Sequence, residues 1–139
     1  MSELLDLVHT LYRGMETNDL DLAMSVFDPD VETAIPNSSL TGSADLRGLL
    51  GAFLTAVPDN RLRIIRHLED GDTILIEATY SGTHTGPLVS PSGTIPPTEQ
   101  AFSFPYADVL TARAGKVVTR HIYWDNVTFL SQLGVLPAA

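Results

Sequence analysis

One carboxylate in this sequence stands where a strand-like pattern gives way to a helix-like one. The segment HIYWDNVTFLSQLG runs from His121 to Gly134, and within it Asp125 directly follows Trp124, the only tryptophan of the chain. A carboxylate in an apolar pocket can remove a proton from carbon and return one to a carbonyl oxygen, because burial raises its pKa toward neutrality. The same residue could instead cap the following helix, which would lower its pKa. The sequence leaves both roles open.

Alternation along the strand determines which neighbours accompany Asp125. Side chains two residues apart point to the same face of a strand, so His121 and Tyr123 share the face of Asp125. Ile122 and Trp124 share the opposite face, and they line the pocket if Asp125 does not. We predict that Asp125 is the catalytic acid/base. The predicted ligand-binding residues beside it are His121, Tyr123 and Trp124.

A further histidine stands beside a loop rich in proline and glycine. His84, in SGTHTG, ends a predicted strand, where it could bind a ligand at the pocket rim or tie the loop down through hydrogen bonds. The four histidines show neither helical i, i+4 spacing nor grouping with carboxylates, so we predict no metal site. The chain has no cysteine, which excludes thiol catalysis and disulfides, and we expect no cofactor.

Length and charge limit the class of protein. The 139 residues suit one domain, residues 1–139, and 44% hydrophobic residues are enough for a core. Seventeen acidic against eight basic residues leave a net charge of -9, which argues against nucleic acid and anionic membranes as partners. The acidic N-terminus does not resemble a signal peptide, and no apolar run approaches the ~20 residues of a membrane span. We therefore predict a cytoplasmic protein with a small hydrophobic ligand.

The first part of the chain has the periodicity of helices. Apolar residues recur at helical spacing over residues 3–17, 20–27 and 43–57, and the sequence DPD ends the second of these segments. Gly48 and Gly51 weaken the third helix by about 1 kcal/mol each relative to alanine. Their small size predicts close approach of another backbone.

From residue 61 the periodicity changes to that of strands. Residues 61–68 and 73–84 flank the turn EDGD, and residues 100–112 and 116–125 flank RAG, so two hairpins are predicted. The segment between them, residues 86–99, is predicted to be a long irregular loop. A short helix or turn, residues 126–134, closes the chain. Helices followed by antiparallel strands predict an α+β fold, with the helices on one face of a curved sheet and a cone open at one end.

Several of these segments, in this order, resemble a known family. FDPDVE, GTHTGPL, DVLTARAGKVV and YWDNVTFLSQLG are similar to the SnoaL-like polyketide cyclase group of the nuclear transport factor 2-like superfamily. The resemblance covers nearly the whole chain. It implies a cone of three N-terminal helices on a curved, mainly antiparallel sheet, and a homodimer formed through that sheet. It also implies cofactor-free aldol ring closure by an aspartate inside the cone, at the position of Asp125.

The cyclases of this group also use a histidine on a neighbouring strand, and this chain departs from that pattern. No histidine lies between Gly86 and Arg120. The nearest polar candidates are Ser103, Tyr106 and Asp108.

Other enzymes of the superfamily provide alternative interpretations. The steroid isomerases have a tyrosine on the first helix, to which Tyr12 could correspond. Tyr12 is therefore included among the predicted ligand-binding residues, and the alternative is that it packs in the core. The base aspartate of the isomerases falls at Ile35 in this chain. The epoxide hydrolases need an arginine between two carboxylates, and Arg63, Arg66 or Arg120 could provide the arginine.

The predicted function is that of a SnoaL-like enzyme acting by acid/base catalysis on a hydrophobic carbonyl compound, such as aldol-type polyketide cyclisation. The alternative from a different class is a non-catalytic module for small-molecule binding or association, because the partner histidine and the isomerase base are both missing.

Overall fold

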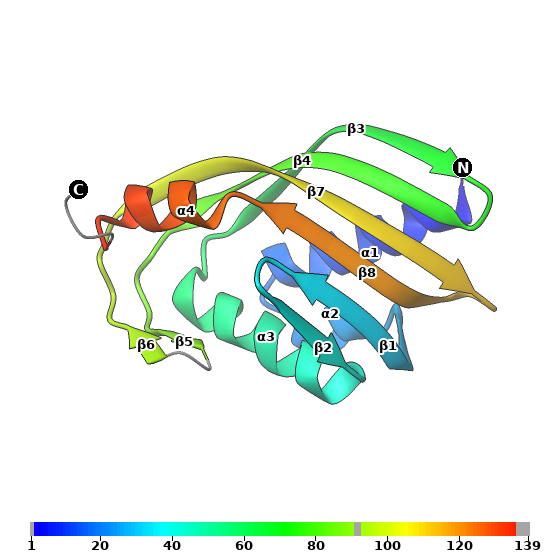
Figure 1. The fold of residues 1–139 in the computed structure, drawn as a ribbon, viewed down its shortest axis with the longest axis horizontal. Helices are drawn as coiled ribbons and strands as arrows, with labels where there is room; N and C mark the ends of the chain where they lie inside the picture. The colour runs from blue at the N-terminus through cyan, green and yellow to red at the C-terminus, as the bar shows by residue number, and fades with distance from the viewer. Residues whose placement is uncertain (1, 91–92, 136–139) are drawn as a thin grey trace.

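The chain folds into helices packed on one face of a curved six-stranded sheet (Figure 1). The computed structural model describes residues 2–90 and 93–135. The helices are α1 (Glu3–Glu16), α2 (Leu20–Met24), α3 (Ser43–Ala56) and α4 (Asn126–Leu133). The strands are β1 (Phe27–Ile35), β2 (Ser38–Thr41), β3 (Arg61–Asp70), β4 (Thr73–Thr83), β5 (Leu88–Ser90), β6 (Gly93–Ile95), β7 (Ala101–Arg113) and β8 (Lys116–Trp124).

The main sheet has the strand order β2-β1-β8-β7-β4-β3, while β5 and β6 form a separate two-stranded sheet. Only the β1–β8 pair of the main sheet is parallel. Figure 1 shows α1, α2 and α3 on the same face of the sheet, with α4 at the end of β8. The predicted α+β architecture, with helices on a curved and mainly antiparallel sheet, is confirmed.

Alternation along the central strands creates one buried face and one exposed face. Every second residue of β7 from Phe102 to Leu110 is buried, and so is every second residue of β4 from Ile74 to Tyr80. The apolar stripes of α1 and α3 cover this inner face, with Val8, Leu11, Met15, Leu46 and Leu50 buried. The core therefore lies between the helices and the inner face.

Both predicted hairpins are present, and their turns have the expected backbone. Ala114 and Gly115, between β7 and β8, both have positive φ, 53° and 79°, as a two-residue type I′ turn requires. Gly71, between β3 and β4, has φ 61°.

Two predicted boundaries were wrong. The second helix was predicted to reach Phe27, but α2 ends at Met24 and Phe27 begins β1, since β1 pairs with β8 from Phe27 onward. The predicted irregular loop 86–99 contains the β5–β6 hairpin. Its start is attached to the end of α3, because the N–H groups of Thr85 and Gly86 both donate to the Ala56 carbonyl.

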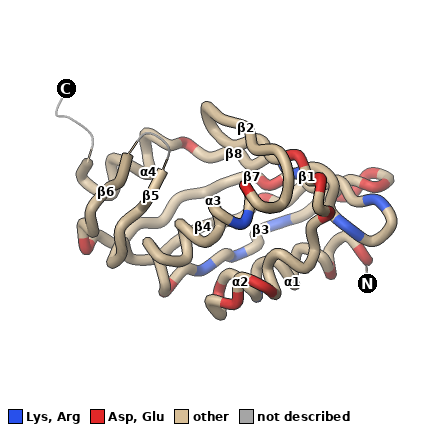
Figure 2. Tube along the Cα trace, turned by 90° about the horizontal axis from the view of Figure 1, so that it is seen from below, with Lys and Arg blue, Asp and Glu red and all other residues tan. Residues whose placement is uncertain are grey.

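Charged residues are unevenly distributed over these elements. Figure 2 shows acidic residues on α2 and basic residues along β3. The basic residues of β3 are Arg61, Arg63 and Arg66, and Arg66 forms an ion pair with Glu77 of β4. Among the described helices, none has the length and apolar character needed to cross a membrane.

The predicted close backbone approach occurs on α1, and not at the glycines of α3. A Cβ built on Gly14 would lie 2.4 Å from the backbone nitrogen of Ala23, in α2. At Gly48 a Cβ would meet nothing within 4 Å, and at Gly51 only the Leu20 side chain at 3.5 Å. The absence of a side chain at Gly14 therefore lets α1 and α2 pack together.

We expect Gly14→Ala to lower the free energy of unfolding by about 1–3 kcal/mol, because the added methyl group forces the two helices apart. The control, Gly48→Ala, should raise it by up to about 1 kcal/mol, since alanine has the higher helix propensity and its methyl group meets no neighbour. Urea denaturation measures both. A Gly14→Ala protein as stable as the wild type would contradict this account of the contact.

Candidate functional site

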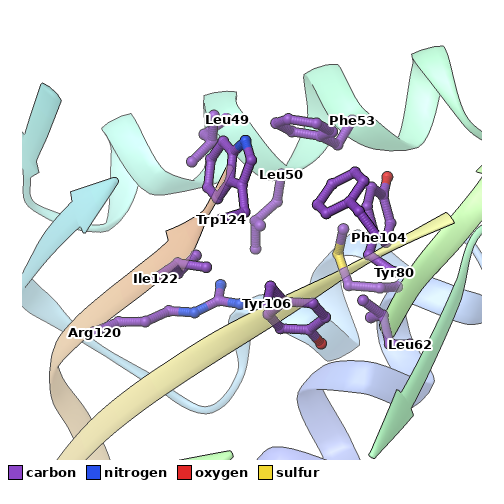
Figure 3. Close-up of a pocket in the computed structure, with 11 residues that line it drawn as sticks. Leu49, Leu50, Phe53, Leu62, Tyr80, Phe104, Tyr106, Arg120, Ile122 and Trp124 are labelled. Carbon is purple, nitrogen blue, oxygen red and sulfur yellow. The ribbon is translucent and has the colours of Figure 1, made fainter. Parts of the chain in front are cut away.

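A small cavity lies between α3 and the inner face of the sheet (Figure 3). Its volume is about 80 Å³ and it is partly open. Most of the wall is apolar or aromatic. The lining residues are Met15, Leu49, Leu50, Phe53, Leu62, Tyr80, Phe104, Tyr106, Arg120, Ile122 and Trp124. An apolar pocket with a few converging polar groups is the usual form of a small-molecule site.

The polar part of the wall depends on a buried ion pair. Arg120 of β8 donates from Nε to Asp108 Oδ1 at 3.1 Å and from Nη2 to Asp108 Oδ2 at 2.9 Å. Tyr12 of α1 donates its hydroxyl to the same Oδ2 at 2.8 Å. The side chains of Asp108 and Arg120 are 0% and 7% exposed. Three donors thus hold one carboxylate, and this carboxylate fixes the direction of the guanidinium group.

The surroundings keep these groups in definite protonation states. Burial alone would lower the pKa of Arg120, but the Asp108 carboxylate outweighs this effect and raises it. The pKa values of Tyr12 and Tyr106 are raised, mainly by burial and to a lesser extent by the negative charge of Asp108. The pKa of Tyr80 is also raised, mainly by burial and to a lesser extent by its interaction with Tyr106. The three tyrosines therefore remain neutral hydroxyl groups at neutral pH.

Three buried polar atoms of the cavity residues have no hydrogen-bond partner within the described residues. They are Nη1 of Arg120 and the hydroxyl oxygens of Tyr80 and Tyr106. A buried polar group without a partner is costly and calls for a physical explanation. All three groups can donate, and Figure 3 shows the two tyrosine hydroxyls pointing in opposite directions, so the three donors can bind different polar atoms of a ligand.

The structure places Asp125 outside this cavity, in an open depression that it lines together with Tyr123 and Trp124. Asp125 is the N-cap of α4 and is solvent-exposed. Its Oδ1 accepts the N–H groups of Val127 and Thr128 at 3.0 and 3.2 Å, and its Oδ2 accepts the Thr128 hydroxyl at 2.9 Å. The hydrogen bonds from Thr128, with that from the Val127 N–H, lower the pKa of Asp125. The capping role that the sequence left open is the one the fold uses.

His121 and Tyr123 share the outer face, as the strand alternation required. Tyr123 is 57% exposed, and its hydroxyl lies 3.4 Å from Nδ1 of His121. The structure therefore brings the two residues together, but on the side of the sheet away from the cavity. On the inner side, Ile122 and Trp124 line the cavity.

The other predicted ligand-binding residues have different positions. Trp124 lines the cavity, packs edge-to-face with Phe53 at 6.4 Å, and donates from Nε1 to Asn126 Oδ1 at 3.1 Å. Tyr12 lies one layer behind the wall, on Asp108. His84 is buried and its Nδ1 lies 3.0 Å from Oγ1 and 3.3 Å from N of Thr98. The interpretation of His84 as a residue that ties down the loop is confirmed.

Among the described residues, Arg120 forms an ion pair with one carboxylate only, that of Asp108. The third hydrogen bond to Asp108 comes from the Tyr12 hydroxyl. This set differs from the arginine between two carboxylates that epoxide hydrolysis would need. Arg66 pairs with Glu77 instead, away from the cavity. Within residues 2–90 and 93–135, no three histidine, aspartate or glutamate side chains are grouped to hold a metal ion.

Sequence reasoning treated Asp108, Tyr106 and Arg120 as secondary candidates and did not connect them. A signal for them does exist in the alternation. Asp108 interrupts the otherwise apolar or aromatic inner face of β7, and Arg120 is in line with the apolar pair Ile122 and Trp124 on β8. A charged residue on an apolar strand face is seldom buried without a partner.

Comparison with known proteins agrees with this geometry. Residues 5–133 match the family model of the SnoaL-like polyketide cyclases. AclR from Streptomyces galilaeus, a proposed hydroxylase, is 26% identical with a TM-score of 0.82, covering 99% of this chain and 89% of its own. A proposed SnoaL-like polyketide cyclase from Jannaschia sp. CCS1 is 16% identical with a TM-score of 0.83. The match covers 97% of this chain and 94% of the Jannaschia chain.

IdmH from Streptomyces antibioticus, a proposed polyketide cyclase, is 23% identical with a TM-score of 0.75, covering 94% of this chain and 98% of its own. No curated protein matches the chain significantly. The match over nearly the whole chain shows that it belongs to the SnoaL-like polyketide cyclase family. The resemblance read from the sequence is confirmed, and so is the nuclear transport factor 2-like fold.

We expect Asp125→Ala to lower the melting temperature by a few degrees at neutral pH, because α4 loses its cap. The folded-state pKa of Asp125 is lowered, so its contribution to stability is present above the unfolded pKa of about 3.9 and is lost as the pH falls through the folded pKa. The deficit of the variant should therefore shrink in acid. Thermal melts at several pH values measure it.

Asp125→Asn is the matched control, because asparagine also caps helices and should keep most of the stability. Following the Asp125 carboxyl by NMR provides a second measurement. A titration near neutrality would contradict the capping assignment and would restore the acid/base one.

Proposed function

We propose that this protein is a SnoaL-type enzyme that acts by acid/base chemistry, without a cofactor, on a hydrophobic carbonyl compound, as in aldol-type ring closure. The observation that carries the proposal is the set of three unpartnered donors in one aromatic cavity: Arg120 Nη1 and the hydroxyls of Tyr80 and Tyr106. An unpartnered donor in the cavity can stabilise the negative charge that develops on a carbonyl oxygen when its α-carbon loses a proton.

The surroundings favour this electrophilic role. The wall is mostly apolar, and a hydrogen bond or a charge acts more strongly there than in water. The raised pKa of Tyr106 keeps its hydroxyl protonated, so it can donate to an enolate oxygen throughout the neutral range. These donors are positioned before the ligand arrives, so little reorganisation is needed during the reaction.

Asp108 serves the site as a positioning residue. Its carboxylate is fully buried and already accepts the Tyr12 hydroxyl and two Arg120 donors, so it is not free to take a proton from a ligand. The described residues that line the cavity therefore include hydrogen-bond donors but no carboxylate. The α-proton would therefore pass to solvent water at the open side of the cavity, while the donors stabilise the enolate oxygen.

A second candidate function has support from the same observation. A cavity with donors and no free base among its described lining residues also fits a binding protein that holds a hydrophobic carbonyl compound without transforming it. Turnover and binding must therefore be measured separately.

Exchange of the methyl protons of acetophenone in D₂O, followed by NMR, tests the proposal, because enolisation is the half-reaction that these donors would promote. The cavity has about 80 Å³, less than the ~150 Å³ that holds benzene in an engineered protein cavity, so the single ring of acetophenone would lie partly in the open side of the cavity. We expect the wild type to accelerate exchange and Tyr106→Phe to lose roughly 10²-fold of that acceleration.

The control is Tyr123→Phe, which removes a tyrosine hydroxyl from the outer face and should exchange acetophenone at the wild-type rate. If acetophenone binds without any acceleration, the binding function replaces the enzymatic one. If Tyr106→Phe exchanges as fast as the wild type, the donor assignment fails.

We propose in addition that two copies of the chain pair through the outer face of the sheet. Leu68, Leu75, Val109 and His121 lie side by side across β3, β4, β7 and β8, while α1, α2 and α3 lie together on one face of the sheet (Figure 1). Leu68 and Leu75 are 64% and 39% exposed. An uncovered apolar row of this kind is typical of a surface that another protein covers.

Sedimentation of the wild type should therefore give a dimer, and Leu75→Asp should give a monomer, because a charge in the middle of the row cannot be buried without a partner. Val127→Asp is the matched control: Val127 is 64% exposed on α4, off this face, so its variant should remain dimeric. A monomeric wild type at micromolar concentration would contradict the proposal.

A further inference from the structure

The cavity contains a cationic group whose charge is already cancelled. Arg120 is the only charged residue among the described lining residues. Its Nε and Nη2 bind both oxygens of Asp108, whose side chain is completely buried behind the wall. The Tyr12 hydroxyl adds a donor to Asp108 without adding charge. The network as a whole is therefore neutral, although the atom that faces the ligand belongs to a cation.

A neutral network discriminates between ligands by charge. A carboxylate that enters an apolar cavity loses its hydration, and only an uncompensated cation would offset that loss. A ketone loses far less hydration and still gains a hydrogen bond from Arg120 Nη1. Without Asp108, the same arginine would attract an anion strongly.

We propose that Asp108 is the specificity-determining residue of the site, which makes the cavity select neutral carbonyl compounds and reject carboxylates of the same shape. This inference rests on the proposed function, because it assumes that the ligand oxygen lies at Arg120 Nη1. It also assigns the order of events: the ligand enters neutral, and negative charge arises on its oxygen only after Arg120 Nη1 has bound that oxygen.

Acetophenone and benzoate test whether the cavity prefers neutral carbonyl compounds to carboxylates. The two differ in one group only: acetophenone has a methyl group where benzoate has a charged oxygen. The dissociation constants of both are measured by calorimetry, and the side-chain N–H signal of Trp124, which lines the cavity, reports by NMR whether each probe enters it. We expect the wild type to bind acetophenone at least about tenfold more tightly than benzoate. Equal binding, or a preference for benzoate, overturns the inference.

Asp108→Asn removes the neutralising charge and should shift the ratio toward benzoate by at least about tenfold. Asp21→Asn is the matched control. Asp21 pairs with Arg47 on the surface, at 2.6 Å, so this variant also frees one arginine and changes the net charge equally. Its selectivity should equal that of the wild type. A similar shift in both variants would assign the effect to overall charge and would overturn the role of Asp108.

The double variant Asp108→Asn/Arg120→Gln keeps the experiment decisive if Asp108→Asn does not fold. It replaces the ion pair by two neutral amides, so no uncompensated charge is left buried. It should reject benzoate as the wild type does, because the network is again neutral. If the double variant prefers benzoate, charge cancellation is not the cause of selection.

Failure of the inference is distinguishable from failure of the proposed function. If neither probe shifts the Trp124 signal, the cavity is not the ligand site and both proposals fall. If both probes enter the cavity with equal affinity while the wild type still accelerates acetophenone exchange, the function stands and the role of Asp108 is overturned.

Discussion

The buried contact between Asp108 and Arg120 is the interaction on which the rest of the site depends. An ion pair inside an apolar core is stable only when its geometry is good and its remaining hydrogen-bonding capacity is used. Here one carboxylate of β7 accepts two hydrogen bonds from Arg120 of β8 and one from Tyr12 of α1, so β7, β8 and α1 are held in one arrangement. Both oxygens of the carboxylate accept hydrogen bonds, whereas Nη1 of Arg120 has no hydrogen-bond partner within the described residues. Because Arg120 lines the cavity, this nitrogen provides the otherwise apolar wall with a hydrogen-bond donor.

The aromatic wall around this nitrogen comes from distant parts of the chain. Phe53 of α3 contacts Tyr80 of β4, Trp124 of β8 and Phe129 of α4, with ring centroids 6.2–6.4 Å apart. α4 closes this end of the wall, and Asp125 supports it by capping the helix. Asp125 thus contributes to the site through the stability of α4, at a distance from the cavity. The residue that first attracts a chemical interpretation has a structural role.

Much of the architecture could be read from periodicity. The two hairpins, the helix stripes and the end of the third helix near Pro58 all follow from local spacing and turn residues, which act over a few positions. The failures lie where pairing partners are distant. Phe27 leaves its predicted helix because β1 pairs with β8, some ninety positions later in the chain. Likewise, the predicted loop forms the β5–β6 hairpin, anchored to α3 through Ala56.

The sequence by itself determined the family, the α+β order of elements and the two alternating sets of side chains on β8. It did not determine which set faces inward, because alternation is symmetric and both faces carry an aromatic residue, Tyr123 on one and Trp124 on the other. Tertiary structure decided this by placing α3 over the Trp124 side. It also joined Tyr12 to Asp108, 96 positions apart, and so decided which charges meet. A buried ion pair requires its partners in three dimensions, and no local spacing in the sequence encodes that requirement.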